Sequence, residues 1–485
     1  MSPTSIVLHP VPKPIRRQIL ATIRANGSTP IGTIVIRILR LIKYLTNLSI
    51  KTGIKIFRLI FVQRSTVSTF LFAYIYEVLP KLVSRFFSHL FKLDFKGYGS
   101  DVIQALSEPL DPGRLPVFMT KLVATLNAFL PIYTSILRPH IQPDQLLFFS
   151  SFCAAFTSAV LNFPSFQTEK LKQDRHYTLD WTLVLITRAL DTVITSNFAS
   201  MVDAKTSTLK HLDRFGDVIM FMASCYVIME TWFYEPEKLP PDYKRWIDKA
   251  TAVDDEIVQG MKYLKSNQLN YDVQDQGGPQ HDHFEKYCTK YGKIPSLGDP
   301  LKFDKLPCEI FHQFKTRSCL KHAVLRFWLQ FKFAFKAYFA INAFVFIFVK
   351  KFRANPIRML IKTVRSASFL GAYSAIQWGV FCYVRNNHPH WFGQRFWDVW
   401  ALKAGSALSG ISIMLEYPDR RDELSMYVAP KALGTFVDPE PTDKNIKMEI
   451  LAFSLSFAVL IAYAKLNPAK LRGLLGKGLS FMVKD

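Results

Sequence analysis

Four residues able to bind a metal stand close together just past the middle of the chain. Cys308, His312, Cys319 and His322 lie within the segment PCEIFHQFKTRSCLKH, and thiolate and imidazole are the usual ligands of structural zinc sites. The stretches between them hold three, six and two residues, a spacing that does not match a common zinc finger. The spacing favours unligated, reduced thiols, and a tetrahedral zinc site that fastens this segment to the following helix is the alternative. More remote candidate ligands are His281, His283 and Cys288.

Charged residues next to apolar runs form a second group. Arg188 and Asp191 are three residues apart, so a helix places both on one face. An ionisable pair at membrane depth predicts a functional site, whereas a helix that ends near residue 186 leaves the pair at the membrane interface, and both interpretations stay open. Glu416, Arg420 and Arg421 belong to a dense mixed-charge turn, for which partial pairing in a solvated loop is the expectation.

No recognised catalytic arrangement accompanies these residues. The sequence has no GxxxxGK[ST] phosphate loop, no GxGxxG, no HExxH, no CxxC and no GxSxG elbow. His388 and His390 stand apart from any histidine cluster of the kind expected in membrane di-iron oxidases. We therefore predict a protein that is not an enzyme and holds no cofactor.

Apolar helices that lie in a membrane are expected to position the residues above. Hydrophobic residues make up 49% of the 485 residues and charged residues 20%, whereas soluble domains carry about 25% charge. Residues 145–167 and 366–384 are free of Asp, Glu, Lys and Arg, and a span needs about 20 residues. We expect about eight to ten membrane segments by this length criterion. The further candidates are 115–137, 177–198, 217–234, 337–349, 399–415 and 450–464.

Two parts of the chain resemble each other in sequence. PVFMTKLVATLNAFLPIYTSI from Pro116 aligns without a gap with PIRMLIKTVRSASFLGAYSAI from Pro356, at an offset of 356 − 116 = 240. Two later matches keep the same order, residues 188–192 with 431–435 and residues 217–236 with 449–468. Order and direction agree across the three matches, which is typical of an internal duplication.

The predicted fold is therefore an all-α, polytopic membrane helical bundle built from two pseudo-symmetric repeats, whose copies are either parallel or inverted. The predicted domains are a basic amphipathic N-terminal region 1–64, a first repeat 65–239, a polar linker 240–307 and a second repeat 308–485. The Pro, Gly and Asp content of the linker indicates an aqueous loop with one or two short helices and no core of its own.

Small residues cluster on one apolar segment of each repeat. Gly405, Ser406, Ser409 and Gly410 lie at helical spacings, which lets helix backbones approach closely in lipid. Close helix packing is favoured over the lining of a transport path, since packing is the general use of such residues. The first repeat has a similar set in Ser151, Ala155 and Ser158.

The positive charge of the chain, +23 in total, is concentrated first at the N-terminus, where no acidic residue precedes Glu77. Between residues 31 and 61, apolar residues recur at helical spacing with basic residues between them. Such a helix fits an anionic lipid surface, and a mitochondrial transit peptide is the second interpretation. A basic arm for nucleic acid is the third, but no nucleic-acid motif accompanies it, so we expect a lipid bilayer and no nucleic acid as partner.

The motifs of the second half resemble a known family. PCEIFHQFKTRSC with its basic, aromatic helix, SASFLGAYSAI from Ser366 and AGSALSGISIMLEYPDRRDELSMYVAPKAL from Ala404 are similar to the transmembrane protein 135 family. Its repeated module is similar to the channel subunits of the mitochondrial inner-membrane import translocases. The resemblance covers most of the second half and the first half more loosely. The first half departs where residues 167–177 replace the paired-arginine turn, and the basic N-terminus has no counterpart.

The resemblance implies a multi-pass protein of the peroxisomal membrane, with a mitochondrial membrane as the alternative. It further implies a role in peroxisome and mitochondrion organisation and in lipid or metabolite handling by a channel-like or carrier-like paired module. The alternative function is a membrane-anchored adaptor that recruits fission, biogenesis or transport proteins through its basic N-terminus and linker. The family has no agreed catalytic residues, so the resemblance assigns none here.

Overall fold

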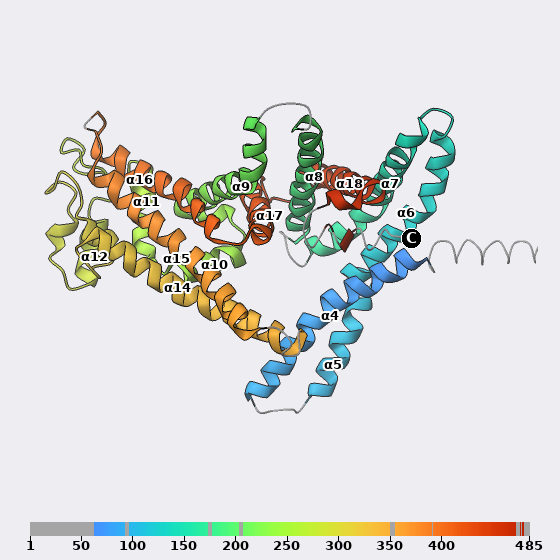
Figure 1. The fold of residues 1–485 in the computed structure, drawn as a ribbon. Helices are drawn as coiled ribbons and strands as arrows, with labels where there is room; N and C mark the ends of the chain where they lie inside the picture. The colour runs from blue at the N-terminus through green and yellow to red at the C-terminus, as the bar shows by residue number, and fades with distance from the viewer. Residues whose placement is uncertain are drawn as a thin grey trace, which may run out of the picture. The chain divides into compact units, whose positions relative to one another are not determined.

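The computed structural model describes residues 63–92, 97–172, 177–202, 207–349, 355–389 and 391–471, together with 476 and 478–479 (Figure 1). Helices and no strand occur within these ranges, which confirms the predicted all-α class. The basic N-terminal segment predicted to contact lipid lies outside the described residues. The chain divides into two compact units, Met1–Ser158 with Phe481–Asp485 and Ala159–Ser480, and the predicted domain boundaries stay predictions.

The first unit is a helical bundle whose helices are fastened by hydroxyl groups. Asn127 Nδ2 of α6 donates to Ser65 Oγ of α4 at 3.0 Å. Ser158 Oγ of α7 donates to the carbonyl of Leu122 in α6 at 2.6 Å, and Ala155 is fully buried one turn earlier. Its elements are α4 (Arg64–Lys92), α5 (Tyr98–Ser107), η1 (Glu108–Leu110), α6 (Leu115–Leu137) and the first part of α7 (Pro143–Leu171).

The second unit contains most of the described helices. They are α8 (Tyr177–Val202), α9 (Ser207–Tyr234), α10 (Pro241–Thr251), α11 (Asp255–Lys265), α12 (His283–Lys290), α13 (Cys308–Phe311), α14 (Cys319–Phe344), α15 (Pro356–Asn386), α16 (Gln394–Ser409), α17 (Pro418–Gly434) and α18 (Asp443–Leu466). Short turns are η2 (Pro236–Lys238), η3 (Pro295–Gly298), η5 (Gly410–Leu415), η6 (Pro468–Lys470) and the π-helical η4 (Val345–Val349).

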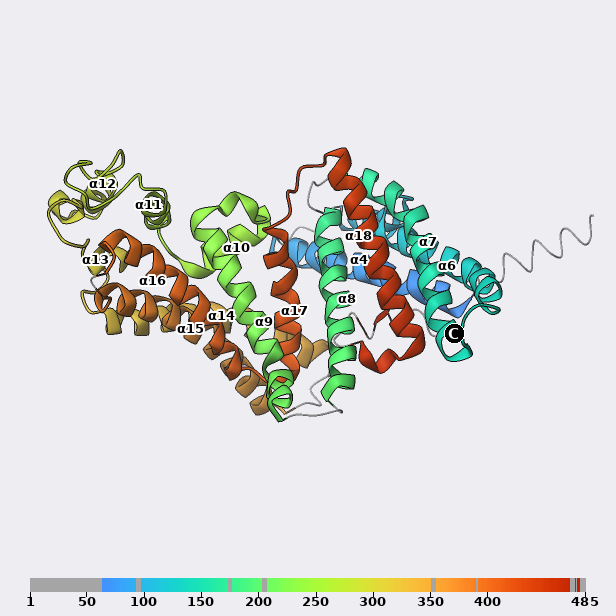
Figure 2. The ribbon, with the colours of Figure 1, turned by 90° about the horizontal axis from the view of Figure 1, so that it is seen from above.

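Helices α14, α15 and α16 run beside one another, as Figures 1 and 2 both show. Local sequence sets where they begin: the Ser318 side chain accepts the backbone N–H of Lys321 at the start of α14. Asn355 accepts the N–H of Ile357 at the start of α15, and Pro356 takes the first helical position. Side chains that accept hydrogen bonds, and proline, are favoured at these positions because the first backbone N–H groups of a helix lack partners within the helix.

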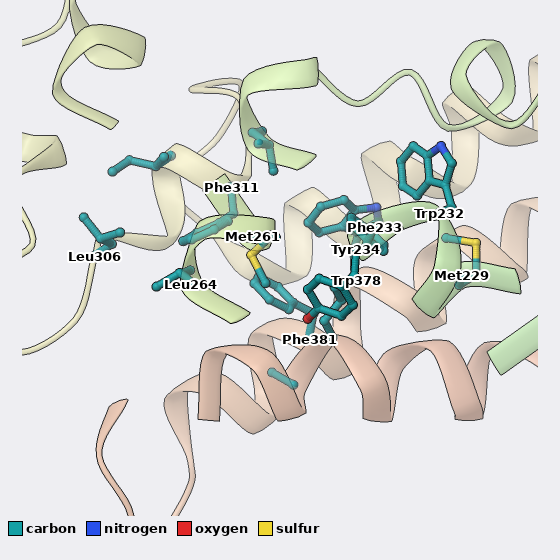
Figure 3. Close-up of a cluster of buried hydrophobic side chains, with 14 of the residues drawn as sticks. Met229, Trp232, Phe233, Tyr234, Met261, Leu264, Leu306, Phe311, Trp378 and Phe381 are labelled. Atoms are coloured by element: carbon teal, nitrogen blue, oxygen red, sulfur yellow. The ribbon is translucent and has the colours of Figure 1, made fainter. Parts of the chain in front are cut away.

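The linker is more ordered than the sequence indicated. It contains three helices, α10, α11 and α12, where one or two were expected. Apolar side chains at 257, 261 and 264 of α11 are fully buried and join a hydrophobic cluster shared with α9, α15 and α16. Figure 3 shows Met261 and Leu264 in this cluster beside Phe381 of α15. The linker thus forms a packed layer whose core is shared with other helices.

Arginines from the long helices cap the linker helices. Arg326 of α14 donates from Nη1 to the carbonyls of Thr251 and Ala252, at 3.0 and 3.2 Å, where α10 ends. Arg395 of α16 donates to the carbonyl of Leu264 at 3.3 Å near the end of α11. A cation is favourable at a helix C-terminus, where unpaired carbonyls carry partial negative charge. These contacts tie the linker to the α14–α16 layer.

Helices α8, α9, α17 and α18 pack side by side. α8 lies against α18, α9 lies against α17, and α8 and α17 meet between them, as Figure 2 also shows. Two ion pairs join α8 to α17: Lys431 Nζ lies 2.7 Å from Asp180 Oδ2, and Arg188 Nη2 lies 3.2 Å from Glu423 Oε2. Arg188 therefore pairs across the helix interface with Glu423.

Five helical stretches of the described residues are long and apolar enough to cross a membrane: Arg64–Phe86, Tyr98–Leu137, Pro143–Leu171, Phe215–Tyr234 and Asp443–Leu466. Four of them contain predicted segments, and the first was not predicted. This number is below the eight to ten expected. Residues 177–198 contain three charges, 337–349 are short, and 399–415 divide between α16 and η5. Residues 366–384 lie in α15, which buries the polar side chains Gln377 and Arg385.

Charge exchange between α8 and α17 tests their packing. Arg188→Glu places two carboxylates together at a site where the native arginine is 8% exposed, and we expect a loss of about 1–3 kcal/mol in unfolding free energy. Arg188→Glu combined with Glu423→Arg restores opposite charges and should recover most of it. Denaturant unfolding of the purified full chain measures both, and a double variant no more stable than the single one contradicts this packing.

Candidate functional site

An apolar cavity of about 200 Å³ lies within the second unit. Aromatic and aliphatic side chains of α9, α10, α14, α15 and α17 line it, and no charged side chain is among its lining residues in the described part of the chain. Figure 3 shows four of the lining residues, Met229, Trp232, Phe233 and Trp378, within the buried hydrophobic cluster. The cavity is partly open, because its lining residues Trp246 and Tyr427 are 46% and 59% exposed. A mostly apolar cleft with few polar groups is the usual form of a small-molecule site.

Gln377 is one of the polar residues in the cavity wall. It is 3% exposed, and its Nε2 donates to Ser406 Oγ at 3.3 Å and to the carbonyl of Leu402 at 3.4 Å. Its Oε1 has no hydrogen-bond partner among the residues that the structure describes. A buried acceptor without a partner costs free energy, so a ligand donor that reaches this oxygen after the side chain turns toward the cavity would gain a hydrogen bond.

Small residues of α16 and η5 allow the helices around the cavity to approach closely. A Cβ atom on Gly405 would lie 2.6 Å from the carbonyl oxygen of Gln377, and one on Gly410 would lie 2.7 Å from Cα of Met222 in α9. Both distances are too short for any larger residue without movement of the backbone. Ser406 and Ser409 are buried in the same stretch. In the first unit, Ser151 and Ser158 are likewise fully buried on α7.

A buried ion pair joins α15 to α16. Arg385 Nε of α15 and Asp398 Oδ1 of α16 are 2.7 Å apart, and both side chains are 0% exposed. Tyr271 of the linker donates to Asp398 Oδ2 at 2.5 Å, and Gln394 donates to Asp398 Oδ1 at 2.7 Å. The Arg385 guanidinium also lies over the ring of Phe311, 4.5 Å from its centre. This network joins the linker, α13, α15 and α16.

Three cysteines meet at the end of α15. The Sγ atoms of Cys308, Cys319 and Cys382 all lie within 4.8 Å of one another, and His312 Nε2 lies 3.3 Å from Cys382 Sγ. Sequence reasoning identified Cys308, Cys319 and His312 but missed Cys382, which is distant in sequence. His322 stacks on His312 with ring centres 4.2 Å apart, and its Nε2 accepts from Arg326. Residues 281, 283 and 288 lie outside this cluster.

Hydrogen bonding and charge favour a thiolate at Cys308. Its hydrogen bond with the Cys382 thiol lowers the pKa of Cys308, and the positive charge of Arg385 acts in the same direction. Arg385 Nη1 lies 3.4 Å and Asn386 Nδ2 lies 3.3 Å from Cys308 Sγ. Burial lowers the pKa of His312, so its imidazole is neutral near pH 7.

The charged residues singled out in the sequence lie on α8 and at the turn between η5 and α17. Asp191 lies half-buried on α8, one turn from Arg188. Glu416 differs from the solvated turn that was expected, because its side chain is 0% exposed, 3.7 Å from Arg420 Nη1. Arg421 donates to the carbonyls of Glu416 at 3.0 Å and Met414 at 2.7 Å. These arginines close the turn between η5 and α17.

The helical fold and its long apolar helices are those of an α-helical membrane protein. The family model that describes the N-terminal cysteine-rich region of Transmembrane protein 135 matches residues 307–438. Residues 307–438 are thus similar to the cysteine-rich region of that family, which confirms the resemblance over this part of the chain. Comparisons with curated proteins and with solved structures found no match.

Removing the Arg385 charge should strongly destabilise the protein. Arg385→Met leaves Asp398 buried without its cationic partner, and losing one member of a buried pair costs about 3–5 kcal/mol. Arg385→Met combined with Asp398→Asn should cost less than the sum of the two single changes, because no charge then stays unpaired. Thermal unfolding in detergent measures this. Arg245→Met, in an ion pair with an arginine side chain that is 71% exposed, is the control; equal shifts for Arg245→Met and Arg385→Met contradict the account.

Proposed function

We propose that this protein is a non-enzymatic organelle membrane protein that holds a lipid-like ligand in the cavity between α9, α14, α15 and α17. The apolar lining of that cavity is the observation that carries the proposal. An apolar cavity of roughly 150 Å³ already binds benzene, so about 200 Å³ accepts part of an acyl chain or a ring of similar bulk.

The cavity wall indicates the chemistry of the ligand. Trp232, Phe233, Phe369 and Trp378 offer large apolar surfaces, and burial of apolar area supplies about 25 cal/mol per Å². The unpartnered Oε1 of Gln377 favours a ligand with one donor, such as a hydroxyl group. The absence of charged lining residues among those described disfavours a free ion or a sugar phosphate.

We further propose that the repeated segments on α8–α9 and α17–α18, all within the second unit, form a paired module related by an approximate two-fold axis between α8 and α17. The sequence offset 431 − 188 = 243 also relates Asp180 to Glu423, since 423 − 180 = 243. When each residue is replaced by its counterpart in the other half, the Lys431–Asp180 ion pair therefore becomes the Arg188–Glu423 ion pair. Two ion pairs that map onto each other in this way support the duplication.

The same correspondence between the halves relates two hydrogen bonds, one between α8 and α18 and the other between α17 and α9. Thr182 of α8 donates to Glu449 Oε1 of α18 at 3.0 Å, and Ser425 of α17 donates to the carbonyl of Asp217 in α9 at 2.8 Å. Thr182 corresponds to Ser425 at the offset of 243, and Asp217 corresponds to Glu449 at the offset of 449 − 217 = 232. Such modules commonly handle their substrate where the repeats meet, and the cavity draws on α9 and on α14, α15 and α17.

The family resemblance favours a peroxisomal membrane, with a mitochondrial membrane as the alternative, and a role in organelle organisation and lipid handling. An adaptor for fission or biogenesis proteins is the second candidate. Two linker side chains favour it, because Val273 and Ile294 are 73% and 72% exposed, the highest exposed fractions among the large apolar side chains of the linker.

Filling the cavity should abolish ligand binding. Ser374 lines it, so Ser374→Leu is expected to reduce photo-crosslinking of a diazirine fatty acid, added to the full chain in nanodiscs, by at least fivefold. Ser368→Leu is the matched control, since Ser368 is also a half-buried serine of α15 but is absent from the cavity wall. Equal labelling of both variants contradicts the proposed site.

The adaptor candidate is separated from ligand handling by changing only the exposed linker residues. Val273→Asp with Ile294→Asp should leave folding and fatty-acid labelling at the level of the native chain, because neither side chain is buried. Organelle morphology in cells is the readout. Normal morphology favours the ligand-handling function, whereas defective morphology with full labelling favours the adaptor.

A further inference from the structure

The cysteine cluster has the composition and dimensions of a metal site. Cys308, Cys319 and Cys382 come from three separate segments, α13, the start of α14 and the end of α15, yet their sulfurs lie within 4.8 Å of one another. A tetrahedral ion with zinc–sulfur bonds of about 2.3 Å holds its sulfurs roughly 3.8 Å apart, so modest rotations of the side chains bring all three to one ion. All three cysteines are free thiols in this structure.

The ring of His312 is already oriented as a ligand. Its Nδ1 lies 2.9 Å from the carbonyl oxygen of Thr316, so Nδ1 carries the proton and Nε2 presents its lone pair. Nε2 lies 3.3 Å from Cys382 Sγ, although His312 is outside the group whose ligand atoms all lie within 4.8 Å of one another, so the ring must move toward the other two sulfurs to complete the site. A carbonyl that fixes the tautomer of a histidine in this way is the usual outer partner of a metal ligand.

Donors around the sulfurs complete the surroundings expected of a thiolate site. Arg385 Nη1 and Asn386 Nδ2 point hydrogen-bond donors at Cys308 Sγ, at 3.4 and 3.3 Å. Asn386 is itself held by the carbonyl of Cys382 at 2.7 Å. Three thiolates and one divalent ion leave an excess negative charge, and Arg385, which also pairs with Asp398, stabilises it by donating a hydrogen bond to one of the sulfurs.

We propose that Cys308, Cys319 and Cys382 bind one Zn²⁺ ion, with His312 Nε2 as the fourth ligand. Soft sulfur ligands with one imidazole select zinc over magnesium or calcium, which require oxygen ligands. Binding releases the thiol protons to solvent and oxidises nothing. The ion has four protein ligands and no open position, so its role is structural.

The site fastens the segment between α13 and α14 to the end of α15. That junction also carries Arg385, whose partner Asp398 binds Tyr271 of the linker. The contact between the linker layer and the long helices is therefore stabilised both by the buried ion pair and by zinc. Ligand binding in the cavity is a separate property, and its loss or retention does not bear on the metal.

The test is the zinc content of the purified full chain, loaded in a zinc-buffered medium and measured by inductively coupled plasma mass spectrometry. We expect one zinc per chain in the native protein and in the control Cys153→Ser, whose thiol lies on α7 outside the cluster. Cys382→Ser should lower zinc affinity, measured by chelator competition, at least tenfold. A native chain without zinc, or Cys382→Ser with native affinity, overturns the proposal.

A second measurement needs no variant and so survives any folding defect. The native protein, stripped by a chelator and refilled with Co²⁺, should show sulfur-to-cobalt charge-transfer absorption, and X-ray absorption of the zinc form should show three sulfur ligands and one nitrogen. A first shell of oxygen and nitrogen only, or thiols that become reactive only after reduction, contradicts the site. Native zinc affinity in His312→Ala overturns the assignment of the fourth ligand.

Discussion

The buried ion pair between Arg385 and Asp398 holds together the parts of the second unit that carry its chemistry. Two charges with no exposure to water are tolerated only when each is paired and hydrogen-bonded. Here the satisfying groups come from different elements: Tyr271 from the linker, Gln394 from α16 and the ring of Phe311 from α13. The need to satisfy these charges therefore fixes how the linker sits on the long helices.

The contact between the linker and the long helices also affects the cavity and the cysteine cluster. The linker helix α10 forms one wall of the cavity through Tyr243, Ile247 and Ala250, so the cavity exists only where the linker is held against α9 and α14. The same arginine touches Cys308. Close packing at Gly405 brings α16 onto Gln377, which is one of the few polar residues in a mostly apolar wall.

Much of the fold was predictable because helical periodicity and length are local signals. The all-α class, four of the stretches that are long and apolar enough to cross a membrane, and both prolines in the first turns of α6 and α15 follow from short windows of sequence. The linker was misjudged because its mean polarity hid the stripe at 257, 261 and 264, whose spacing is that of a buried helix face. Cys382 was missed because only the tertiary fold brings α15 back to Cys308. Burial of Glu416 likewise depends on helices far along the chain.

The central claim is that the cavity of the second unit is a ligand site and not a packing defect. The most direct measurement is an experimental structure of the full chain, determined by electron microscopy in nanodiscs made with lipids of the organelle. The account predicts elongated density between Trp232, Phe369 and Trp378, with a polar end near Gln377. A cavity that collapses or stays empty in the presence of those lipids would contradict it.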